Sequence, residues 1–286
     1  MPVELRDAQV TVVGLGLMGG SLAAALKENR SCRWVAGVGR RDETVRQALR
    51  AELLDEGTRD LAEGVRNADI VVLATPVRTI IKLIGEIGPL LRPGCLLTDV
   101  GSTKQMIVQA MQTLPSHVQP LGGHPMCGKE SAGLSAADPS LYTGASYVLT
   151  PLARTHDESL DLAQQMAQAV GAQPLLLDAA RHDLLVAAVS HLPYLTAVGL
   201  VSTAQSLDDD TVWAVASSGF RDTTRLAAGE ETMMLDILLT NRAETGRMLA
   251  SLQSQLAELS QLLEAGDEPA LRAVIDRAAR QRRRLQ

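Results

Sequence analysis

The stretch Val10–Leu26, VTVVGLGLMGGSLAAAL, joins an apolar run to a helical pattern through a glycine-rich turn. Gly14, Gly16 and Gly19 have the GxGxxG spacing of a dinucleotide-binding turn, in which the glycines permit a tight bend, close approach of the backbone to a pyrophosphate, and close helix packing. Backbone amides at the start of the helix then bind the anion. The spacing alone is weak evidence, but the strand before it, the helix after it and a second strand beginning at Trp34 supply the required context.

The rest of the first half repeats this alternation. Short apolar runs predict buried strands over residues 9–14, 34–38, 69–75, 95–100, 145–151 and 174–178, and helical patterns cover residues 21–28, 42–56 and 157–170. Near-continuous Val, Ile and Leu runs separated by helices indicate a parallel sheet covered by helices on both faces.

After Asp178 the sequence has no further strand signal. A long apolar helical stretch covers residues 179–205, and we expect Pro193 to interrupt it. Five leucines then recur at three- and four-residue steps, the spacing of a helix seam that forms core or dimer contacts; they are Leu249, Leu252, Leu256, Leu259 and Leu263. We predict an α/β Rossmann-like dinucleotide-binding domain over residues 1–178 and an all-helical domain for substrate binding and dimerisation over residues 179–286.

Composition excludes several classes of partner. The net charge of −6 and the 2% aromatic content provide neither attraction to phosphate backbones nor platforms for base stacking, so we expect no nucleic acid partner. No uninterrupted apolar run reaches about 18 residues, so no membrane span is predicted. Cys32, Cys95 and Cys127 are unevenly spaced, which indicates a reducing compartment and no metal cluster. We expect a cytoplasmic protein.

The end of the second predicted strand bears on the choice of cofactor. NAD-binding proteins place an Asp or Glu about 20 residues past the glycine motif, on the ribose hydroxyls. Gly39 occupies that place here, and Arg40 and Arg41 follow. Two guanidinium groups without an opposing acid favour the 2′-phosphate of NADP. The alternative is that both arginines are merely solvated and Asp42 binds the ribose.

A histidine stands in the stretch Gly122–Glu130, GGHPMCGKE, where Gly and Pro oppose regular helix or strand. We expect a loop after a parallel strand, at the sheet edge where α/β proteins bind ligands. Taken alone, a single histidine is more often a structural residue, although an imidazole also has a suitable pKa for a general base at working pH.

Five stretches occurring in order resemble the prephenate/arogenate dehydrogenase family of tyrosine biosynthesis; they are GLGLMGGS (14–21), DVGSTK (99–104), GGHPMCGKESAG (122–133), SHLPY (190–194) and GFRDTTR (219–225). The match spans about residues 10–241. It implies oxidative decarboxylation of a cyclohexadienol, with a hydride passing to the nicotinamide and the ring becoming aromatic. No metal is required, because aromatisation makes loss of carbon dioxide favourable.

The resemblance also implies the site. It places His124 and Ser102 in catalysis; Arg225, Glu130, His191, Tyr194 and Met234 at the substrate; and Gly14, Leu15, Gly16, Leu17, Met18, Gly19, Gly39, Arg40, Arg41, Thr75, Pro76 and Ser102 at the cofactor. For His191 a structural role in the core is an equal alternative. The family is similar in forming homodimers through its helical half.

Two departures from the family pattern concern the substrate. Members that prefer prephenate commonly carry a second histidine where this chain has Tyr194, and the Trp sometimes found after the GFRDTTR motif is Met234 here. The resemblance is therefore nearer to the arogenate-type branch, with prephenate or dual specificity as the alternative. A β-hydroxyacid dehydrogenase would need a lysine from the helical domain, and none follows Lys129. A non-catalytic NADP-sensing module would need the glycine turn but not the catalytic residues.

Overall fold

The computed structural model describes residues 3–129 and 131–285. By internal contacts the chain divides into two compact units, residues 1–241 and 242–286. This division concerns compactness and does not test the domain boundary predicted near Asp178.

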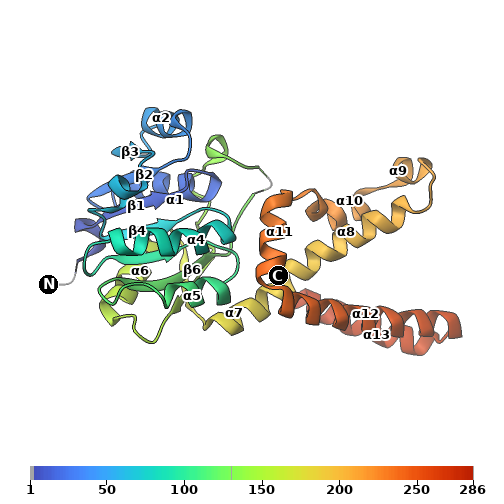
Figure 1. Cartoon of the computed structure of the whole chain (residues 1–286). Coiled ribbons are helices and arrows are strands. Elements are labelled where there is room, and N and C mark those ends of the chain that lie inside the picture. Colours follow the sequence, from blue (N-terminus) through green and yellow to red (C-terminus); the bar gives the residue numbers. More distant parts are fainter. Residues whose placement is uncertain (1–2, 130, 286) are drawn as a thin grey trace. The chain divides into compact units, whose positions relative to one another are not determined.

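An eight-stranded sheet forms the centre of the first unit, in the order β3-β2-β1-β4-β5-β6-β7-β8 (Figure 1). The strands are β1 (Gln9–Val13), β2 (Trp34–Val38), β3 (Glu56–Thr58), β4 (Ile70–Leu73), β5 (Leu96–Asp99), β6 (Gln119–Pro125), β7 (Ser146–Pro151) and β8 (Gln173–Leu176). All six predicted strands are present, while β3 and β6 were not predicted. The predicted helix over residues 42–56 ends at Arg50, and its last predicted residue, Glu56, is the first residue of β3.

Strand β6 corrects two expectations. The sheet is not wholly parallel, because β6 runs antiparallel to β7 while the remaining neighbours pair in parallel. His124 lies within β6, opposite Val148 of β7, and not in a loop. The two glycines before it do not break the strand, since side chains of neighbouring elements and the Asp99 carbonyl fill the space that their side chains would take.

Helices cover both faces of the sheet, as predicted. They are α1 (Leu17–Glu28), α2 (Asp42–Arg50), α3 (Leu61–Val65), α4 (Val77–Ile87), α5 (Gln105–Met111) and α6 (Asp157–Ala169). Successive residues of a strand join different hydrophobic clusters: Val12 and Val72 belong to one, Val13 and Val71 to the other. A strand that is buried on both faces reads as a continuous apolar run, which explains why these strands were predictable.

Residues Ala179–Gln205 form a continuous helical stretch made of α7 (Ala179–Val186), a π-helical turn (Ala187–His191) and α8 (Leu192–Gln205). The predicted break at Pro193 is wrong. Pro193 lies in the first turn of α8, directly after the π-helical turn, and such turns are a common way to accommodate an irregularity inside a helix.

This stretch is also the one, among the residues described, that is long and apolar enough to cross a membrane; its mean hydropathy is 1.8 and 22% of the window is buried within the chain. Core and interface helices share these properties. The remaining helices of the first unit are α9 (Thr211–Val215), α10 (Ser218–Thr224) and α11 (Glu231–Thr240).

The second unit is a helical hairpin of α12 (Arg242–Ala265) and α13 (Glu268–Arg282). The predicted leucine seam lies on α12. Leu249, Leu252 and Leu259 are half-buried, whereas Leu256 and Leu263 are exposed. The hairpin alone therefore does not bury the whole seam.

Candidate active site

The glycine turn between β1 and α1 has the geometry that a dinucleotide requires. Gly14 has a φ of +108°, and a Cβ there would lie 2.5 Å from the carbonyl oxygen of Ala74. A Cβ on Gly19 would lie 2.0 Å from the carbonyl oxygen of Gly14, so only glycine permits this strand–helix packing. Gly16 has no atom within 4 Å of its Cβ direction, which leaves its backbone open to a ligand. The turn fits a pyrophosphate.

Helices α1, α4 and α5 follow the strands β1, β4 and β5 at the carboxyl edge of the sheet, and of these three only α1 has an N-terminus that no carboxylate of the described residues covers. Gly16 caps α1 without a side-chain hydrogen bond, and the first turn holds no acid. The Asp236 carboxylate accepts a hydrogen bond at 3.1 Å from the Arg78 amide in α4, and Asp183 does the same for α5. The positive end of α1 is therefore the one left for an anion.

Other residues of the predicted turn take different positions. Leu17 and Met18 are half-buried in the first turn of α1, and the carbonyl of Met18 accepts a hydrogen bond of 2.8 Å from the Tyr142 hydroxyl. The side chain of Leu15 lies in the hydrophobic core. Any contact of Leu15 with a cofactor is therefore a backbone contact.

The end of β2 presents the predicted basic residues. Gly39 is buried, and its amide donates to the Thr58 carbonyl at 3.1 Å, while Arg40 and Arg41 are exposed. Asp42, the alternative ribose ligand, forms an ion pair at 3.2 Å with Arg59, which follows β3. A third guanidinium group therefore lies at this edge and engages the one acid next to the two arginines.

The turn after β4 carries Thr75 and Pro76, and Pro76 caps α4. The hydroxyl oxygen of Thr75 is buried and has no hydrogen-bond partner among the residues described. Its methyl group lies 2.8 Å from the position of a Cβ on Gly14, so this turn lies against the glycine turn.

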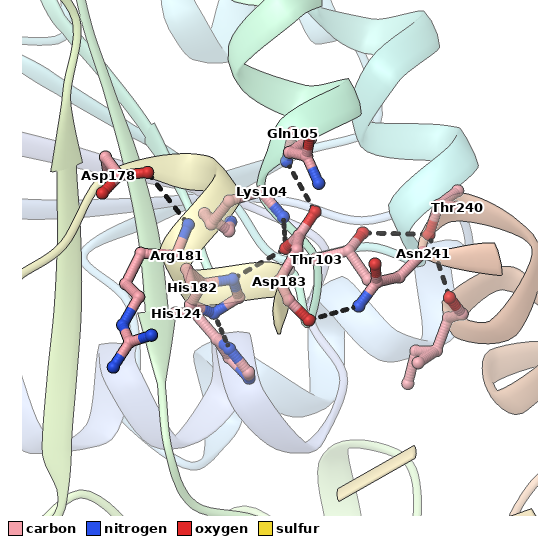
Figure 2. A network of polar contacts seen from close by, with 12 residues as sticks. Thr103, Lys104, Gln105, His124, Asp178, Arg181, His182, Asp183, Thr240 and Asn241 are labelled. Atoms are coloured by element: carbon pink, nitrogen blue, oxygen red, sulfur yellow. Dashed lines mark hydrogen bonds and ion pairs between the residues drawn. The ribbon is translucent and has the colours of Figure 1, made fainter. Parts of the chain in front are cut away.

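A chain of three polar side chains ends at His124 (Figure 2). His124 Nδ1 lies 2.8 Å from His182 Nε2, and His182 Nδ1 lies 2.8 Å from Asp183 Oδ1. The same carboxylate accepts hydrogen bonds from the amides of Lys104 at 2.7 Å and Gln105 at 2.9 Å. These bonds hold the pKa of Asp183 below its usual value, although burial acts in the opposite direction. Asp183 is therefore an anion fixed at the N-terminus of α5.

The anion determines which ring nitrogens carry protons. Ionised Asp183 only accepts, so His182 donates from Nδ1 and offers an Nε2 lone pair. His124 then donates from Nδ1, which leaves its Nε2 as a free acceptor. Burial, followed by the positive charge of Lys104, lowers the pKa of His124 well below 6.5. At neutral pH His124 is an unprotonated base in a fixed tautomer.

His191 belongs to the same cluster. It is buried in the π-helical turn, and its Nδ1 lies 3.3 Å from Asn241 Nδ2, which also donates to the Asp183 carbonyl at 2.7 Å. Burial lowers the pKa of His191 to about 4, so its ring is neutral. Beside it, the hydroxyls of Thr103 and Thr240 lie 2.9 Å apart, which connects the start of α5 to α11.

The remaining predicted site residues take three positions. Ser102 is half-buried between β5 and α5, directly before the segment that Asp183 caps. Tyr194 and Met234 come together around Gly229, with Tyr194 Cε2 and Met234 Cγ 3.5 and 3.4 Å from the position of its Cβ. Arg225 is exposed at the start of the short helix Arg225–Ala228, which packs on α8. Glu130 lies outside the described residues.

Comparison with known proteins agrees with this arrangement. The family model described as "Prephenate dehydrogenase, nucleotide-binding domain" matches residues 22–176, and the one described as "Prephenate dehydrogenase, dimerization domain" matches residues 178–277. The chain belongs to the prephenate/arogenate dehydrogenase family. These are oxidoreductases of tyrosine biosynthesis with a nucleotide-binding domain followed by a helical dimerisation domain.

Three family members illustrate the likeness. A prephenate dehydrogenase of Bacillus subtilis is 35% identical over 84% of this chain, which spans 65% of that relative's length. A prephenate dehydrogenase of Aquifex aeolicus, solved with hydroxyphenyl propionate and NAD+, is 27% identical with a TM-score of 0.91, covering 98% of both chains. A Synechocystis arogenate dehydrogenase is 31% identical with a TM-score of 0.85, covering 97% of this chain and all of the other.

Sequence reasoning missed His182 and Asp183, which hold the candidate base of this family member. A His-Asp pair in a helix reads as a solvated turn unless its burial is known, and both side chains are almost completely buried here. One signal was available: they open a long stretch that is otherwise strongly apolar, where charged and polar groups are expected to be paired.

Proposed function

We propose that this chain catalyses the oxidative decarboxylation of L-arogenate to L-tyrosine with NADP as the acceptor. The observation that carries the proposal is the base at the carboxyl edge of the sheet: His124 with a free Nε2, oriented by His182 and Asp183. It lies on the edge where the glycine turn and the uncovered N-terminus of α1 fit a dinucleotide.

The chemistry divides between the cofactor and the chain. When bound, the nicotinamide supplies a hydride acceptor for the ring carbon that bears the hydroxyl group. His124 Nε2 accepts the hydroxyl proton as that carbon gains carbonyl character, and it returns the proton to the same oxygen when the ring becomes aromatic. The ring carboxylate leaves as carbon dioxide and its bonding electrons complete the aromatic ring. Ser102 and the cation Arg225 are proposed to hold the hydroxyl group and a carboxylate of the substrate.

NADP is proposed because the end of β2 carries cations where NAD-binding proteins carry an acid. Arg40 and Arg41 are exposed beside Gly39, and Arg59 engages Asp42. That ion pair is more than half exposed and is worth at most about 1 kcal/mol, so it supports the proposal without deciding it. NAD, which the Aquifex aeolicus structure contains, is the alternative acceptor.

Replacing both Arg40 and Arg41 by Ala should raise the KM for NADP and leave the kinetics with NAD nearly unchanged, because only NADP carries the 2′-phosphate. Initial rates over a range of each cofactor measure this. Equal effects on the two cofactors would contradict the assignment. Arg46→Ala is a matched control, since Arg46 is an exposed arginine of α2 that pairs with Glu43.

Arogenate is proposed because of the residues around Gly229. The two substrates share the ring, its hydroxyl group and its carboxylate, but arogenate carries an ammonium group where prephenate carries a keto group. Prephenate therefore has one more net negative charge and favours a site with an added cation or donor. Tyr194 and Met234 meet at Gly229 and supply no cation. Glu130, if it faces the site, favours the ammonium group.

Specificity constants for arogenate and prephenate, each with NADP and with NAD, test the proposed function directly. We expect the arogenate value with NADP to be the highest.

Tyr194→His should improve the use of prephenate relative to arogenate, because it introduces a second imidazole. A prephenate constant equal to or above the arogenate constant in the unaltered chain would favour the alternative, a prephenate or dual-specificity cyclohexadienyl dehydrogenase. Absence of both activities would refute the enzyme proposal.

We also infer a homodimer formed through the helical half. The match to the family's dimerization domain supports it, as do the exposed apolar side chains of the helical stretch and of α12. They include Val189, Leu200, Leu256 and Leu263. Sedimentation at micromolar concentration should give twice the chain mass, and a monomer there would contradict the inference. The predicted cytoplasmic location stays a prediction.

A further inference from the structure

Strand β6 loses its partner β5 just before it reaches His124. The two strands pair only at Leu96↔Gln119 and Leu97↔Pro120. Beyond that point the backbone N–H and C=O groups of Gly123 still point toward β5. The corresponding groups of Gly122 and His124 point the other way, into the antiparallel ladder with β7. Gly123 would therefore have an unpaired N–H and an unpaired C=O group inside the protein.

A buried ion pair satisfies both groups. The Gly123 amide donates to Asp99 Oδ1 at 3.0 Å, and Lys104 Nζ donates to the Gly123 carbonyl at 2.6 Å. Asp99 Oδ2 and Lys104 Nζ are in contact with each other, which closes a ring around one residue. Asp99 Oδ2 also accepts a hydrogen bond of 2.7 Å from the Gly101 amide. This closed set of bonds among Gly123, Asp99 and Lys104 takes the place of the β5–β6 ladder next to His124.

The space around Gly123 permits no looser arrangement. A Cβ on this residue would lie 2.3 Å from the carbonyl oxygen of Asp99, so β5 approaches the backbone as closely as glycine allows. A Cβ on Gly122 would lie 3.2 Å from Lys104 Cδ, so the lysine stem packs along the same strand. The side chains of Asp99 and Lys104 are both 0% exposed.

Fold stability alone does not account for this pair. Removing two charges from water is costly, and an ion pair in a protein core is often no more stable than well-packed apolar side chains of the same volume. Burial lowers the pKa of Lys104, and Asp99 opposes that shift. What the ion pair adds is one specific position for the residue before His124.

We propose that Asp99 and Lys104 form a clamp on Gly123 that positions His124 for proton transfer. Neither side chain is proposed to touch the substrate. The charged or titratable groups around His124 are His182 and Asp183 of α7, His191 of the π-helical turn, and the clamp itself. The inference rests on the proposed function for its kinetic readout.

The test is Lys104→Met, which keeps much of the side-chain volume and removes the charge and the bond to Gly123. We expect kcat to fall at least 10-fold, while the dissociation constant of NADP changes less than about threefold because the glycine turn is untouched. The acid limb of the kcat profile should move to higher pH, because loss of a nearby cation stabilises protonated His124. Lys82→Met is the matched control: Lys82 is 77% exposed on α4, and its replacement should change none of the three quantities.

A second variant covers the case in which Lys104→Met fails to fold. The double change Asp99→Asn and Lys104→Gln leaves no unpaired charge in the core and retains neutral donors and acceptors for Gly123. Its acid limb should move less than that of Lys104→Met, because the negative charge of Asp99 is lost together with the positive charge of Lys104. Titration of the His124 ring by NMR gives the same shift without any substrate, so the clamp is tested even if the proposed reaction is wrong. A folded variant whose His124 titrates as in the unaltered chain, with unchanged kcat, overturns the proposal.

Discussion

Replacing His124 by Ala is expected to lower kcat by on the order of 10²–10⁴-fold, the usual contribution of a positioned acid or base. The pKa of His124 is held well below 6.5, so the ring is an available base throughout the neutral range and the acid limb of the unaltered chain should lie below pH 6.5. Steady-state rates measure the loss, and calorimetry should show NADP binding nearly unchanged.

His124→Asn sharpens this experiment. Its amide group can still donate to His182 from near the position of Nδ1, but it offers no atom in the place of Nε2. We expect it to be as inactive as the Ala variant. His156→Ala is the control, because His156 is exposed at the start of α6. A His124 variant with near-normal turnover would remove this residue from the mechanism.

Asp183→Asn should have the second largest effect. It keeps an oxygen beside His182 but removes the negative charge that stabilises the protonated histidines as the reaction proceeds. We expect kcat to fall on the order of 10²-fold or more, with an upper bound near the ~10⁴-fold loss that follows neutralisation of the carboxylate in a Ser-His-Asp triad. Rates at saturating substrate measure it.

The structure offers a matched control for the other role of Asp183, which is to cap α5. Asp236 caps α4 through the Arg78 amide and also forms an ion pair with the Arg78 side chain, and among the described residues it has no hydrogen bond to His182. Each Asp→Asn change places an amide group against a backbone N–H and should cost about 1–3 kcal/mol of stability. Only Asp183→Asn should also lose turnover. If Asp236→Asn lost turnover equally, the effect of Asp183→Asn would be structural. The proposed role of Asp183 in orienting His182 and His124 would then be wrong.

The sheet was predictable from the sequence where strands are buried on both faces. Strand β4 (Ile70–Leu73) faces helices on either side, so each of its positions is apolar and the pattern is clear. Strand β3 was not predicted because it has only the three residues Glu56–Thr58 and follows a helical pattern in the sequence. Strand β6 was not predicted because its central residues are Gly122 and Gly123. These glycines are required there because neighbouring chain segments approach closely.

The candidate site was predictable only in part, and the reason is distance along the chain. The glycine turn is a local device, and its three glycines have the local geometry expected of them. The hydrogen bond between His124 and His182 joins residues separated by 58 positions, and no spacing rule connects the two. The clamp spans 24 positions between Asp99 and Gly123 and depends on where the pairing of strands β5 and β6 ends. Such contacts arise from tertiary structure alone.

The position of His124 within a strand has a consequence for the entropy of the proposed reaction. Its backbone is paired with Val148 on one side, and its neighbour Gly123 is bonded on the other. A base on a loop would lose conformational freedom each time substrate bound, and that loss would raise the barrier. Here the freedom is already lost when the chain folds. Binding energy from the substrate can then serve to align the ring hydroxyl with Nε2, the kind of prior ordering that makes a reaction between two bound groups effectively intramolecular.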